Sequence, residues 1–340
     1  MKAFQLSETC GESGLILRKD LDKPEPGPGE VLIHVKANSL NFRDFMIAHG
    51  KYPAGVKHCV IPLSDGAGDV VAVGQDVTAV KVGDRVAGAV FPDWMNGPLT
   101  EEIFHRSLGG PIDGMLAEYV VLPERAAIRY PEHLSYEEAA TLPNAGVTAW
   151  HALVESGRIR AGQTVLLLGT GGVCLFALQF AKLHSATVIQ TSSSDEKLEQ
   201  ARAMGADHLI NYSKTPDWDR EVMKLTGGRG VDIVVEVGGA QTLERSVRSV
   251  RFGGFVALIG LISGFGQIDP LPLMLRSIRL LGIHIGSAGM FHEMNRAIAA
   301  TRLRPVIART FTFDHAAYAY AYNFHETASH FGKTVISSSQ

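Results

Sequence analysis

The stretch TVLLLGTGGVCLFALQFAKLHSATVIQTSSSDEKL, residues 164–198, decides the fold. It begins with the continuous apolar run 164–168, and glycines follow at 169, 171 and 172. Residues 172–184 carry a helical pattern, and the apolar segment 186–191 comes next. Because a glycine turn separates an apolar strand from a helix and a second strand, this order predicts a βαβ unit with parallel strands.

The same alternation continues to about residue 287. Three further short apolar segments, 208–211, 231–237 and 254–260, are separated by helical patterns, and RLLGIHIG at 279–286 is a candidate for one more strand. Near-continuous apolar strands alternating with helices predict a parallel sheet covered by helices on both faces. We therefore expect an α/β domain with a doubly wound sheet over residues 141–287.

The flanking sequence differs in texture. Residues 30–40, 68–74 and 83–90 are short segments rich in β-branched residues, separated by Gly and Pro, and the end of the chain is again rich in strand-forming residues. This spacing is typical of a compact β-barrel. The prediction is that residues 1–140 and 288–340 form one β-rich, barrel-like domain into which the nucleotide-binding domain is inserted.

Composition excludes some classes of function. The chain has 35 acidic and 32 basic residues and a net charge of -3, with no basic block, which argues against a nucleic-acid binder. Its amino terminus lacks a signal-peptide pattern, and its apolar runs are too short to cross a bilayer. Three cysteines, Cys10, Cys59 and Cys174, are widely separated and odd in number, which favours reduced thiols and a cytoplasmic location.

The glycine turn predicts a dinucleotide site. Gly169 permits a tight turn, Gly171 and Gly172 let the backbone approach a pyrophosphate, and the helix beginning near Val173 offers free N–H groups to that anion. Cys174 occupies the place of the third glycine of the fingerprint. We interpret it as a small packing residue; a redox role at the start of a helix is the alternative.

The second strand is followed by hydroxyls rather than by an acid. NAD sites place a carboxylate there to bind the ribose 2′-hydroxyl, whereas this chain has Thr191, Ser192, Ser193 and Ser194, with Lys197 one turn later. Hydroxyls donate to a 2′-phosphate that a carboxylate would repel, so the sequence favours NADP(H). Asp195 is the counter-argument, and we interpret it as the N-cap of the next helix.

Several motifs together resemble those of the medium-chain dehydrogenase/reductase superfamily, in its zinc-independent branch of quinone oxidoreductases and enoyl reductases. They include ANSLNFRDFMIAHGKYP at 37–53, AATLPNAGVTAW at 139–150, TGGRGVDIVVEVGG at 226–239 and FGKTVI at 331–336. The resemblance covers nearly the whole chain and implies that the β-rich domain is GroES-like. It is specific for the fold and much less specific for the substrate.

The resemblance also implies cofactor contacts. Lys197 and Tyr212 match positions that hold the 2′-phosphate in relatives that use NADPH, and Thr148 matches a threonine near the nicotinamide. Further positions implied to touch the cofactor are Gly238, Gly260, Ser263 and Lys333. The alternative for the two glycines is that they simply turn the chain.

Where alcohol dehydrogenases of this superfamily bind catalytic zinc, the resemblance places Asn41, Ser64 with Asp65, and Asn144. Amides and hydroxyls do not match the thiolate and imidazole ligands that zinc prefers. The cysteines of a structural zinc lobe are absent as well. His49 and the pair His58–Cys59 are interpreted as core or loop residues, and no zinc is expected.

The NFRD segment supplies the catalytic candidates. The Asn41 amide can polarise a carbonyl, and Asp44 can relay a proton, although a buried aspartate more often bonds nearby backbone. Phe42, Tyr52 and Trp94 are candidates for lining the substrate pocket, with ordinary packing as the alternative.

Without a Lewis acid, hydrogen bonds alone must stabilise oxygen charge, which favours an activated acceptor. We therefore expect NADPH-dependent reduction of a small molecule, either a quinone or an α,β-unsaturated carbonyl. The alternatives are a metal-free alcohol or aldehyde dehydrogenase and a non-catalytic NADPH-binding structural or regulatory protein. The apolar segment 279–286 at a sheet edge favours a homodimer.

Overall fold

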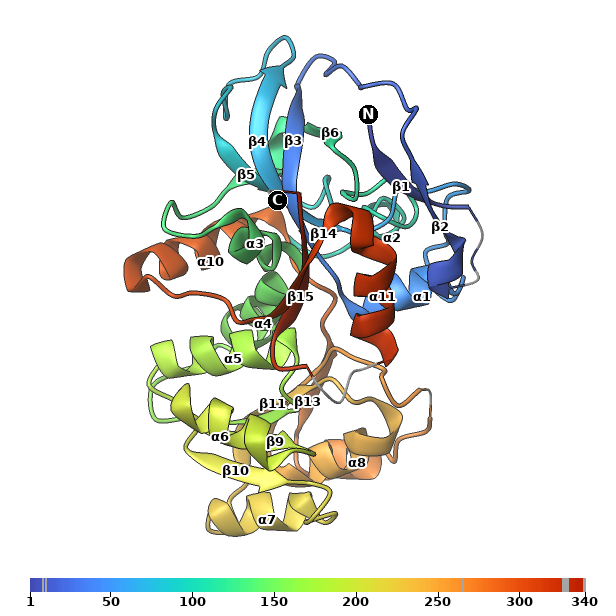
Figure 1. The fold of residues 1–340 in the computed structure, drawn as a ribbon. Coiled ribbons are helices and arrows are strands. Elements are labelled where there is room, and N and C mark those ends of the chain that lie inside the picture. The colour runs from blue at the N-terminus through green and yellow to red at the C-terminus, as the bar shows by residue number, and fades with distance from the viewer. Residues whose placement is uncertain (8, 10, 265, 326–329, 339–340) are drawn as a thin grey trace. The chain divides into compact units, whose positions relative to one another are not determined.

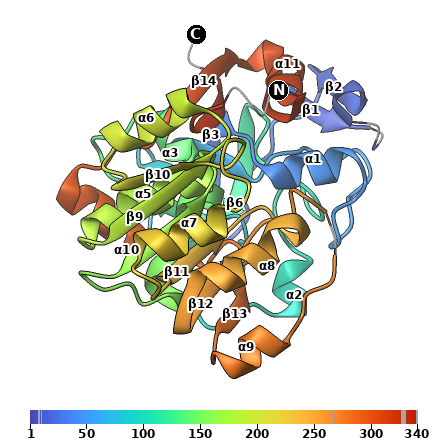
Figure 2. The same cartoon turned by 90° about the horizontal axis from the view of Figure 1, so that it is seen from below.

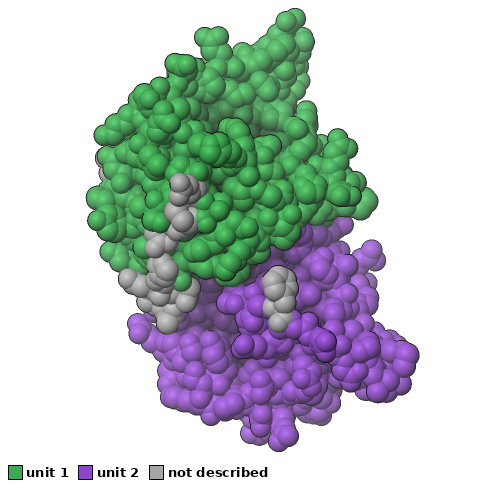
Figure 3. All heavy atoms as spheres, turned by 90° about the vertical axis from the view of Figure 1, so that its right-hand side faces the viewer, with its two compact units in different colours: residues 1–147, 286–340 green, residues 148–285 purple. Residues whose placement is uncertain are grey.

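The computed structural model describes residues 1–340 except 8, 10, 265, 326–329 and 339–340, and Cys10 therefore lies outside the described residues. The chain divides into two compact units, residues 1–147 with 286–340 (unit 1) and residues 148–285 (unit 2), which are coloured separately in Figure 3. Among the described residues, no helix is both long and apolar enough to span a membrane.

Unit 2 contains a six-stranded sheet in the order β10-β9-β8-β11-β12-β13, with every neighbouring pair parallel (Figure 1). Its strands are β8 (Thr164–Leu168), β9 (Thr187–Ser192), β10 (His208–Asn211), β11 (Val231–Glu236), β12 (Val250–Leu258) and β13 (Arg279–Gly282). Its helices are α5 (Gly172–Leu183), α6 (Asp195–Ala203), α7 (Trp218–Leu225), α8 (Ala240–Ser249) and α9 (Leu271–Leu275). The strand order reverses beside β8, which confirms the predicted doubly wound sheet.

Helices cover both faces of this sheet. Figure 2 shows α5 and α6 along one side of the strands and α7 and α8 along the other. The central strands are therefore buried on both sides: Leu166 and Val234 are fully buried, as is Val256. This double burial is the physical reason why β8 and β11 are continuously apolar rather than alternating.

Unit 1 contains a larger sheet in the order β14-β15-β3-β4-β5-β7, with β6 also paired to β3, and a separate hairpin of β1 and β2. The strands are β1 (Ala3–Leu6), β2 (Leu15–Arg18), β3 (Glu30–Ser39), β4 (Asp65–Val73), β5 (Arg85–Gly88), β6 (Tyr119–Pro123), β7 (Ala127–Arg129), β14 (Ile307–Thr312) and β15 (Lys333–Ser337). The helices are α1 (Phe42–Ala48), α2 (Glu101–Phe104), α3 (Tyr136–Ala140), α10 (Ala288–Thr301) and α11 (Ala316–His325). This β-rich unit has the expected GroES-like character.

The helical segment after α3 joins the two units. It consists of the π-helix Leu142–Gly146, α4 (Val147–Trp150) and the π-helix His151–Ser156. The first π-helix packs against α3, β4, β5 and α10, all in unit 1. Unit 2 therefore begins at Thr148, seven residues after the expected start of the nucleotide-binding domain at 141, because the side chains of the first π-helix are buried in the β-rich unit.

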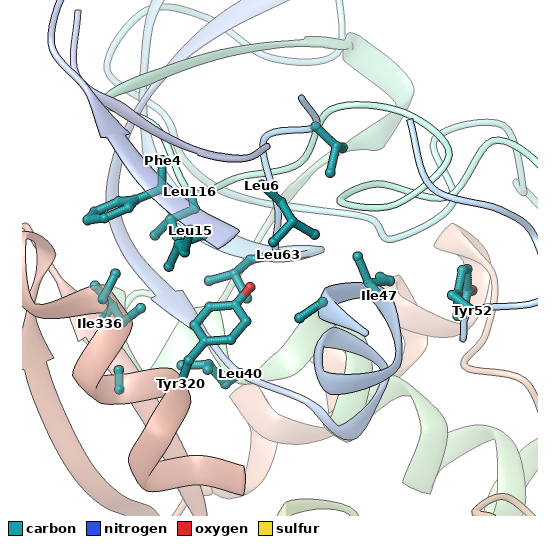
Figure 4. Packing of buried hydrophobic residues seen from close by; sticks show 14 of the residues in the cluster. Phe4, Leu6, Leu15, Leu40, Ile47, Tyr52, Leu63, Leu116, Tyr320 and Ile336 are labelled. Atoms are coloured by element: carbon teal, nitrogen blue, oxygen red, sulfur yellow. The ribbon is translucent and has the colours of Figure 1, made fainter. Parts of the chain in front are cut away.

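One core cluster of unit 1 joins distant parts of the chain. Figure 4 shows Tyr320 of α11 among Leu40, Leu63 and Leu116, with Phe4 of β1 and Ile336 of β15 nearby. The sequence predicts strands at the end of the chain, and β14 and β15 are present, but α11 lies between them. We missed this helix because AAYAYAYNFH lacks the polar face that usually marks a helix on a surface.

Candidate functional site

The glycine turn of unit 2 leaves room for a ligand. Gly169 has φ of +93°, a conformation that favours glycine, and no atom lies within 4 Å of the place where a Cβ would stand on Gly169 or Gly171. Gly172 and Val173 are the first two residues of α5, so Gly172 is helical rather than part of the turn. Their N–H groups lack intrahelical partners by position, and the open turn fits a pyrophosphate there.

Cys174 packs in the first turn of α5. Its side chain is 2% exposed, its thiol donates to the carbonyl oxygen of Leu168 at 3.1 Å, and burial, together with the charge of Glu236, raises its pKa to about 12. A thiol with that pKa is protonated and unreactive near neutral pH. The geometry favours the packing interpretation over the redox alternative.

The hydroxyls after β9 differ in accessibility. Ser192 is buried and its Oγ accepts from the Ser194 N–H at 3.3 Å, whereas Ser193 is exposed. Ser194, not Asp195, is the N-cap of α6, because its Oγ accepts from the backbone N–H of Lys197. The N-cap assignment of Asp195 is therefore wrong.

Asp195 is instead the first residue of α6, and its carboxylate binds the Asn211 amide at 2.7 Å and the Lys214 ammonium. Those bonds, that to Lys214 above all, lower the pKa of Asp195. Asp195, the acid that follows the serines in the sequence, thus already binds Asn211 of β10 and Lys214 beyond it.

The two residues predicted to hold a 2′-phosphate differ in burial. The Lys197 side chain lies in α6 and is 9% exposed; burial lowers its pKa, and among the described residues no acid pairs with it. Tyr212 follows β10 and is 42% exposed. A cation without a carboxylate partner is well suited to bind an added phosphate.

The glycines that follow later strands are required by packing. A Cβ on Gly238 would lie 2.3 Å from Thr242 Oγ1, and one on Gly260 would lie 2.1 Å from the Val237 carbonyl oxygen. Ser263 Oγ donates to the Gly238 carbonyl at 2.8 Å and accepts from the Gln241 N–H at 3.0 Å. These residues therefore hold the loops at the carboxyl ends of β11 and β12, where ligands of doubly wound sheets bind.

Thr148 begins unit 2, and its Oγ1 is buried without a partner among the described residues. A buried hydroxyl without a hydrogen bond costs free energy, so the Thr148 hydroxyl is well suited to form a hydrogen bond with a bound ligand. Thr148 lies between two π-helices, and π-helical turns are frequently found at functional sites.

In unit 1, the catalytic candidate Asn41 lies in one hydrogen-bonded cluster with Lys333 and Asp65. Lys333 Nζ donates to Asn41 Oδ1 at 2.5 Å and lies 3.8 Å from Asp65 Oδ2, while Asn41 Nδ2 donates to that same Asp65 oxygen at 2.9 Å. Lys333 is 4% exposed and Asp65 is fully buried. The Lys333 ammonium is thus bonded inside unit 1, and its contact with the cofactor stays a prediction.

The electrostatics of this cluster do not fit zinc. Burial raises the pKa of Asp65 and lowers the pKa of Lys333, while each partly offsets the shift of the other by its opposite charge. Asp65 also accepts from Ser64 Oγ at 2.9 Å, so both its oxygens are occupied. A neighbouring ammonium would repel Zn²⁺, and the described residues contain no group of three or more His, Cys, Asp or Glu able to hold a metal.

Asp44 lies in α1, and its Oδ2 accepts from the Asn41 backbone N–H at 2.7 Å, while Oδ1 has no partner among the described residues. Burial raises the pKa of Asp44 to about 7. The buried Tyr320 hydroxyl likewise lacks a described partner, and burial and the Asp44 charge raise its pKa. The bond from the Asn41 backbone N–H is the ordinary structural role that the sequence analysis gave as the alternative for Asp44.

The three aromatic candidates for the substrate pocket have different environments. Phe42 is 40% exposed and stacks on Phe45. Tyr52 is 6% exposed, with the Arg43 guanidinium 4.9 Å from its ring centre. Trp94 is 2% exposed and its Nε1 donates to the Gly97 carbonyl at 2.9 Å, so its indole acts as a packed residue of unit 1.

Comparison with known proteins supports the family. Residues 27–132 match the model of the alcohol dehydrogenase GroES-like domain, and residues 172–300 match that of the zinc-binding dehydrogenases. A zinc-type alcohol dehydrogenase-like protein of Schizosaccharomyces pombe is 43% identical over 316 residues, 91% of each chain. A quinone oxidoreductase of Pseudomonas aeruginosa is 36% identical over 247 residues, 72% of this chain and 69% of its own length.

Solved structures agree along the whole chain. A Sinorhizobium meliloti protein described as an alcohol dehydrogenase has a TM-score of 0.90 at 38% identity, covering 99% of this chain and 98% of its own. An NAD-dependent alcohol dehydrogenase has a TM-score of 0.88 at 34% identity, and a mycobacterial protein complexed with NADPH one of 0.82 at 29%, each with 99% coverage of both chains. The chain belongs to the medium-chain dehydrogenase/reductase superfamily and is an oxidoreductase of that superfamily.

Proposed function

We propose that this protein is an NADPH-dependent reductase that transfers hydride to a quinone or an α,β-unsaturated carbonyl without zinc. The observation that carries the proposal is the hydrogen-bonded cluster of Asn41 with the buried Asp65 and Lys333, at positions where the family resemblance places the catalytic zinc ligands of alcohol dehydrogenases. A quinone oxidoreductase among the relatives and a structural neighbour complexed with NADPH are consistent with it.

Unit 2 binds the cofactor in this proposal. The open turn at Gly169 and Gly171 and the first N–H groups of α5 receive the pyrophosphate. Ser192, Ser193 and Lys197 bind the 2′-phosphate. The nearby Asp195 carboxylate is not available to bind the ribose 2′-hydroxyl of NADH, because it already binds Lys214 and Asn211. When bound, NADPH supplies the hydride.

Unit 1 stabilises the acceptor. The Asn41 amide donates a hydrogen bond to the acceptor oxygen, where negative charge builds as hydride adds to the conjugated carbon. The proton that completes the reduction comes from solvent. A preorganised neutral donor suits an acceptor that is already electrophilic, whereas an unactivated alcohol or ketone would need a stronger Lewis acid.

The test begins with cofactor binding. The protein is titrated with NADPH and NADH in parallel while nicotinamide fluorescence is followed, and then 1,4-benzoquinone or a simple enone is added. Tighter binding of NADPH, with oxidation only in the presence of acceptor, is the expected result. NADPH binding without turnover of any acceptor would favour the non-catalytic alternative, and turnover of alcohols alone would favour the dehydrogenase alternative.

We also propose a homodimer formed through the β13 edge of unit 2. Apolar side chains are exposed at and near this edge: Leu281 of β13 is 47% exposed, Phe252 of β12 68%, and Met274 and Leu275 of α9 68% and 64%. An apolar edge strand that bonds only one neighbour favours pairing with a second copy.

A further inference from the structure

The side-chain amide of Asn41 is held at both ends. Its oxygen accepts from Lys333 Nζ at 2.5 Å, and its nitrogen donates to Asp65 Oδ2 at 2.9 Å. A lysine ammonium can only donate and an ionised carboxylate can only accept. The two partners therefore specify which end of the amide is nitrogen, and a flipped amide would lose both hydrogen bonds.

The partners are themselves fixed by neighbouring strands. Lys333 is the first residue of β15, and Asp65 is the first residue of β4, paired in register with Ser39 at the end of β3. Lys333 also donates to the Leu40 carbonyl at 2.5 Å, and Asp65 Oδ2 also accepts from Ser39 Oγ at 3.3 Å. The sheet order β15-β3-β4 thus aligns the ammonium and the carboxylate on either side of Asn41.

These bonds leave the Asn41 side chain one group that can bind a ligand, its second N–H. Its oxygen is occupied, and one of its two side-chain N–H groups binds Asp65. Among the described residues, no acceptor binds the second N–H, and Asn41 is only partly buried. The residue can therefore offer a ligand an oriented N–H donor.

We propose that Lys333 and Asp65 are positioning residues that hold Asn41 as a hydrogen-bond donor to the carbonyl oxygen of the acceptor. The inference rests on the proposed function for the identity of that ligand. It deepens the proposal by assigning the recognised group, since a fixed donor selects an oxygen that gains negative charge during reduction.

The decisive experiment is a double-mutant cycle on quinone reduction with saturating NADPH. Asn41→Ala and Lys333→Met are each expected to lower kcat/KM for the quinone by about tenfold or more, the effect typical of losing a preorganised donor. If Lys333 acts through Asn41, adding Lys333→Met to Asn41→Ala causes little further loss. The dissociation constant of NADPH, measured by fluorescence, is expected to change less than about twofold in all variants, since Lys333 and Asn41 are bonded to each other and to Asp65 within unit 1. A full multiplicative loss in the double variant would overturn the proposal, because Lys333 would then act independently of Asn41.

Removing Lys333 alone leaves Asp65 buried without its counter-ion, which can prevent folding. The paired variant Lys333→Met with Asp65→Asn removes both charges together and replaces the carboxylate by an isosteric amide. This variant is expected to fold and still to lose quinone reduction by about tenfold, because the Asn41 amide is no longer oriented. Full activity in the folded paired variant would contradict the positioning role.

A second readout does not depend on turnover. In a ¹⁵N spectrum, the side-chain amide pair of Asn41 is identified by its loss in Asn41→Ala. We expect one hydrogen, bound to Asp65, to exchange slowly with solvent and the other to exchange fast, and this difference to disappear in the paired variant. If the unmodified protein reduces no acceptor, the proposed function fails, while this measurement still tests whether Lys333 and Asp65 hold the Asn41 amide. An Asn41 signal unchanged by the paired substitution would refute that positioning role.

Discussion

Ser192 lies at the end of β9 with its hydroxyl accepting the Ser194 N–H, and no acid among the described residues takes the ribose position expected for NAD specificity. Ser192→Asp is expected to weaken NADPH binding by about tenfold or more, since repulsion between like charges about 4 Å apart costs about 1 kcal/mol in water and more near a protein surface. NADH binding should be kept or improved. Parallel fluorescence titrations of the two cofactors measure the ratio, with Ser192→Asn as the neutral control; an unchanged ratio would mean that the serines do not contact the phosphate.

Lys197 offers the complementary test at the same site. Its ammonium pairs with no acid among the described residues, whereas Lys214 is bonded to Asp195. Lys197→Gln is expected to raise the dissociation constant of NADPH by about tenfold and that of NADH very little, because a charge-assisted phosphate contact is lost. Lys224→Gln is the matched control and should leave the preference nearly unchanged, because Lys224 of α7 is exposed and pairs with Glu221. Equal losses for both cofactors would show that Lys197 acts on packing rather than on the 2′-phosphate.

Asp44 provides a pH-dependent prediction. Burial raises the pKa of its carboxyl to about 7 in the folded protein, against 3.8 for an exposed aspartate. Between these values the unfolded chain releases a proton that the folded chain keeps, so this group makes stability fall as pH rises from about 4 to 7, with little change above.

Asp44→Asn removes that titration. The unmodified protein should lose stability from pH 5 to pH 8 through this group, whereas the variant should not. The difference in free energy of unfolding between variant and unmodified protein should therefore shift in favour of the variant by up to the order of 3 kcal/mol over this range, given about 1.4 kcal/mol per pKa unit. Urea unfolding of both proteins at the two pH values measures the change, and a difference in stability that is independent of pH would contradict the raised pKa.

Individual site residues were predictable where a motif has a single physical use. The glycine turn and the hydroxyls after the second strand follow from what a pyrophosphate and a ribose require, and these residues lie at the start of α5 and the end of β9. The bond between Lys333 and Asn41 was not predictable, because it joins residues 292 positions apart and needs the register of β15, β3 and β4.

At the scale of elements, the first turn of α5 determines how its cysteine behaves. A helix start ordinarily favours a thiolate, but Cys174 is buried, bonded to Leu168 and close enough to Glu236 for that charge to raise its pKa further, to about 12. We expect iodoacetamide at pH 8 to leave Cys174 unmodified in the folded protein and to label the more accessible Cys59. Peptide mass mapping before and after urea measures both sites. Rapid labelling of Cys174 in the native protein would revive its redox alternative.

Elements with a strong period were predicted well, and those defined by tertiary packing were not. The short apolar runs of β8 and β11, bounded by turn residues, were correctly predicted as buried strands, and β13 lies at the sheet edge as expected. The helix α11 was missed because its alanine- and tyrosine-rich sequence carries little periodic polarity, and its Tyr320 is placed by the core of unit 1. The N-cap of α6 was displaced by one residue since several adjacent side chains can cap a helix equally well.

At the scale of the whole molecule, the exposed apolar surface near β13 requires an explanation. Single exposed apolar residues are common, but Leu281, Phe252, Met274 and Leu275 all belong to β12, β13 and the helix between them. In β10, at the opposite edge of the same sheet, His208, Leu209 and Asn211 are half-buried and Ile210 is buried, so no apolar side chain of that strand is exposed. This asymmetry between the edges favours pairing through β13 rather than through β10.

The last prediction tests that pairing. The unmodified protein should show, by light scattering at micromolar concentration, twice the 36.6 kDa of one chain. Leu281→Lys introduces two charges of like sign across a symmetric edge and is expected to give a single-chain mass with cofactor binding retained, because the glycine turn lies at β8. Val82→Lys is the matched control: Val82 is 58% exposed in unit 1, and its substitution should leave the mass at two chains. A single-chain mass for the unmodified protein would exclude the homodimer, and a two-chain mass that survives Leu281→Lys would place the interface elsewhere.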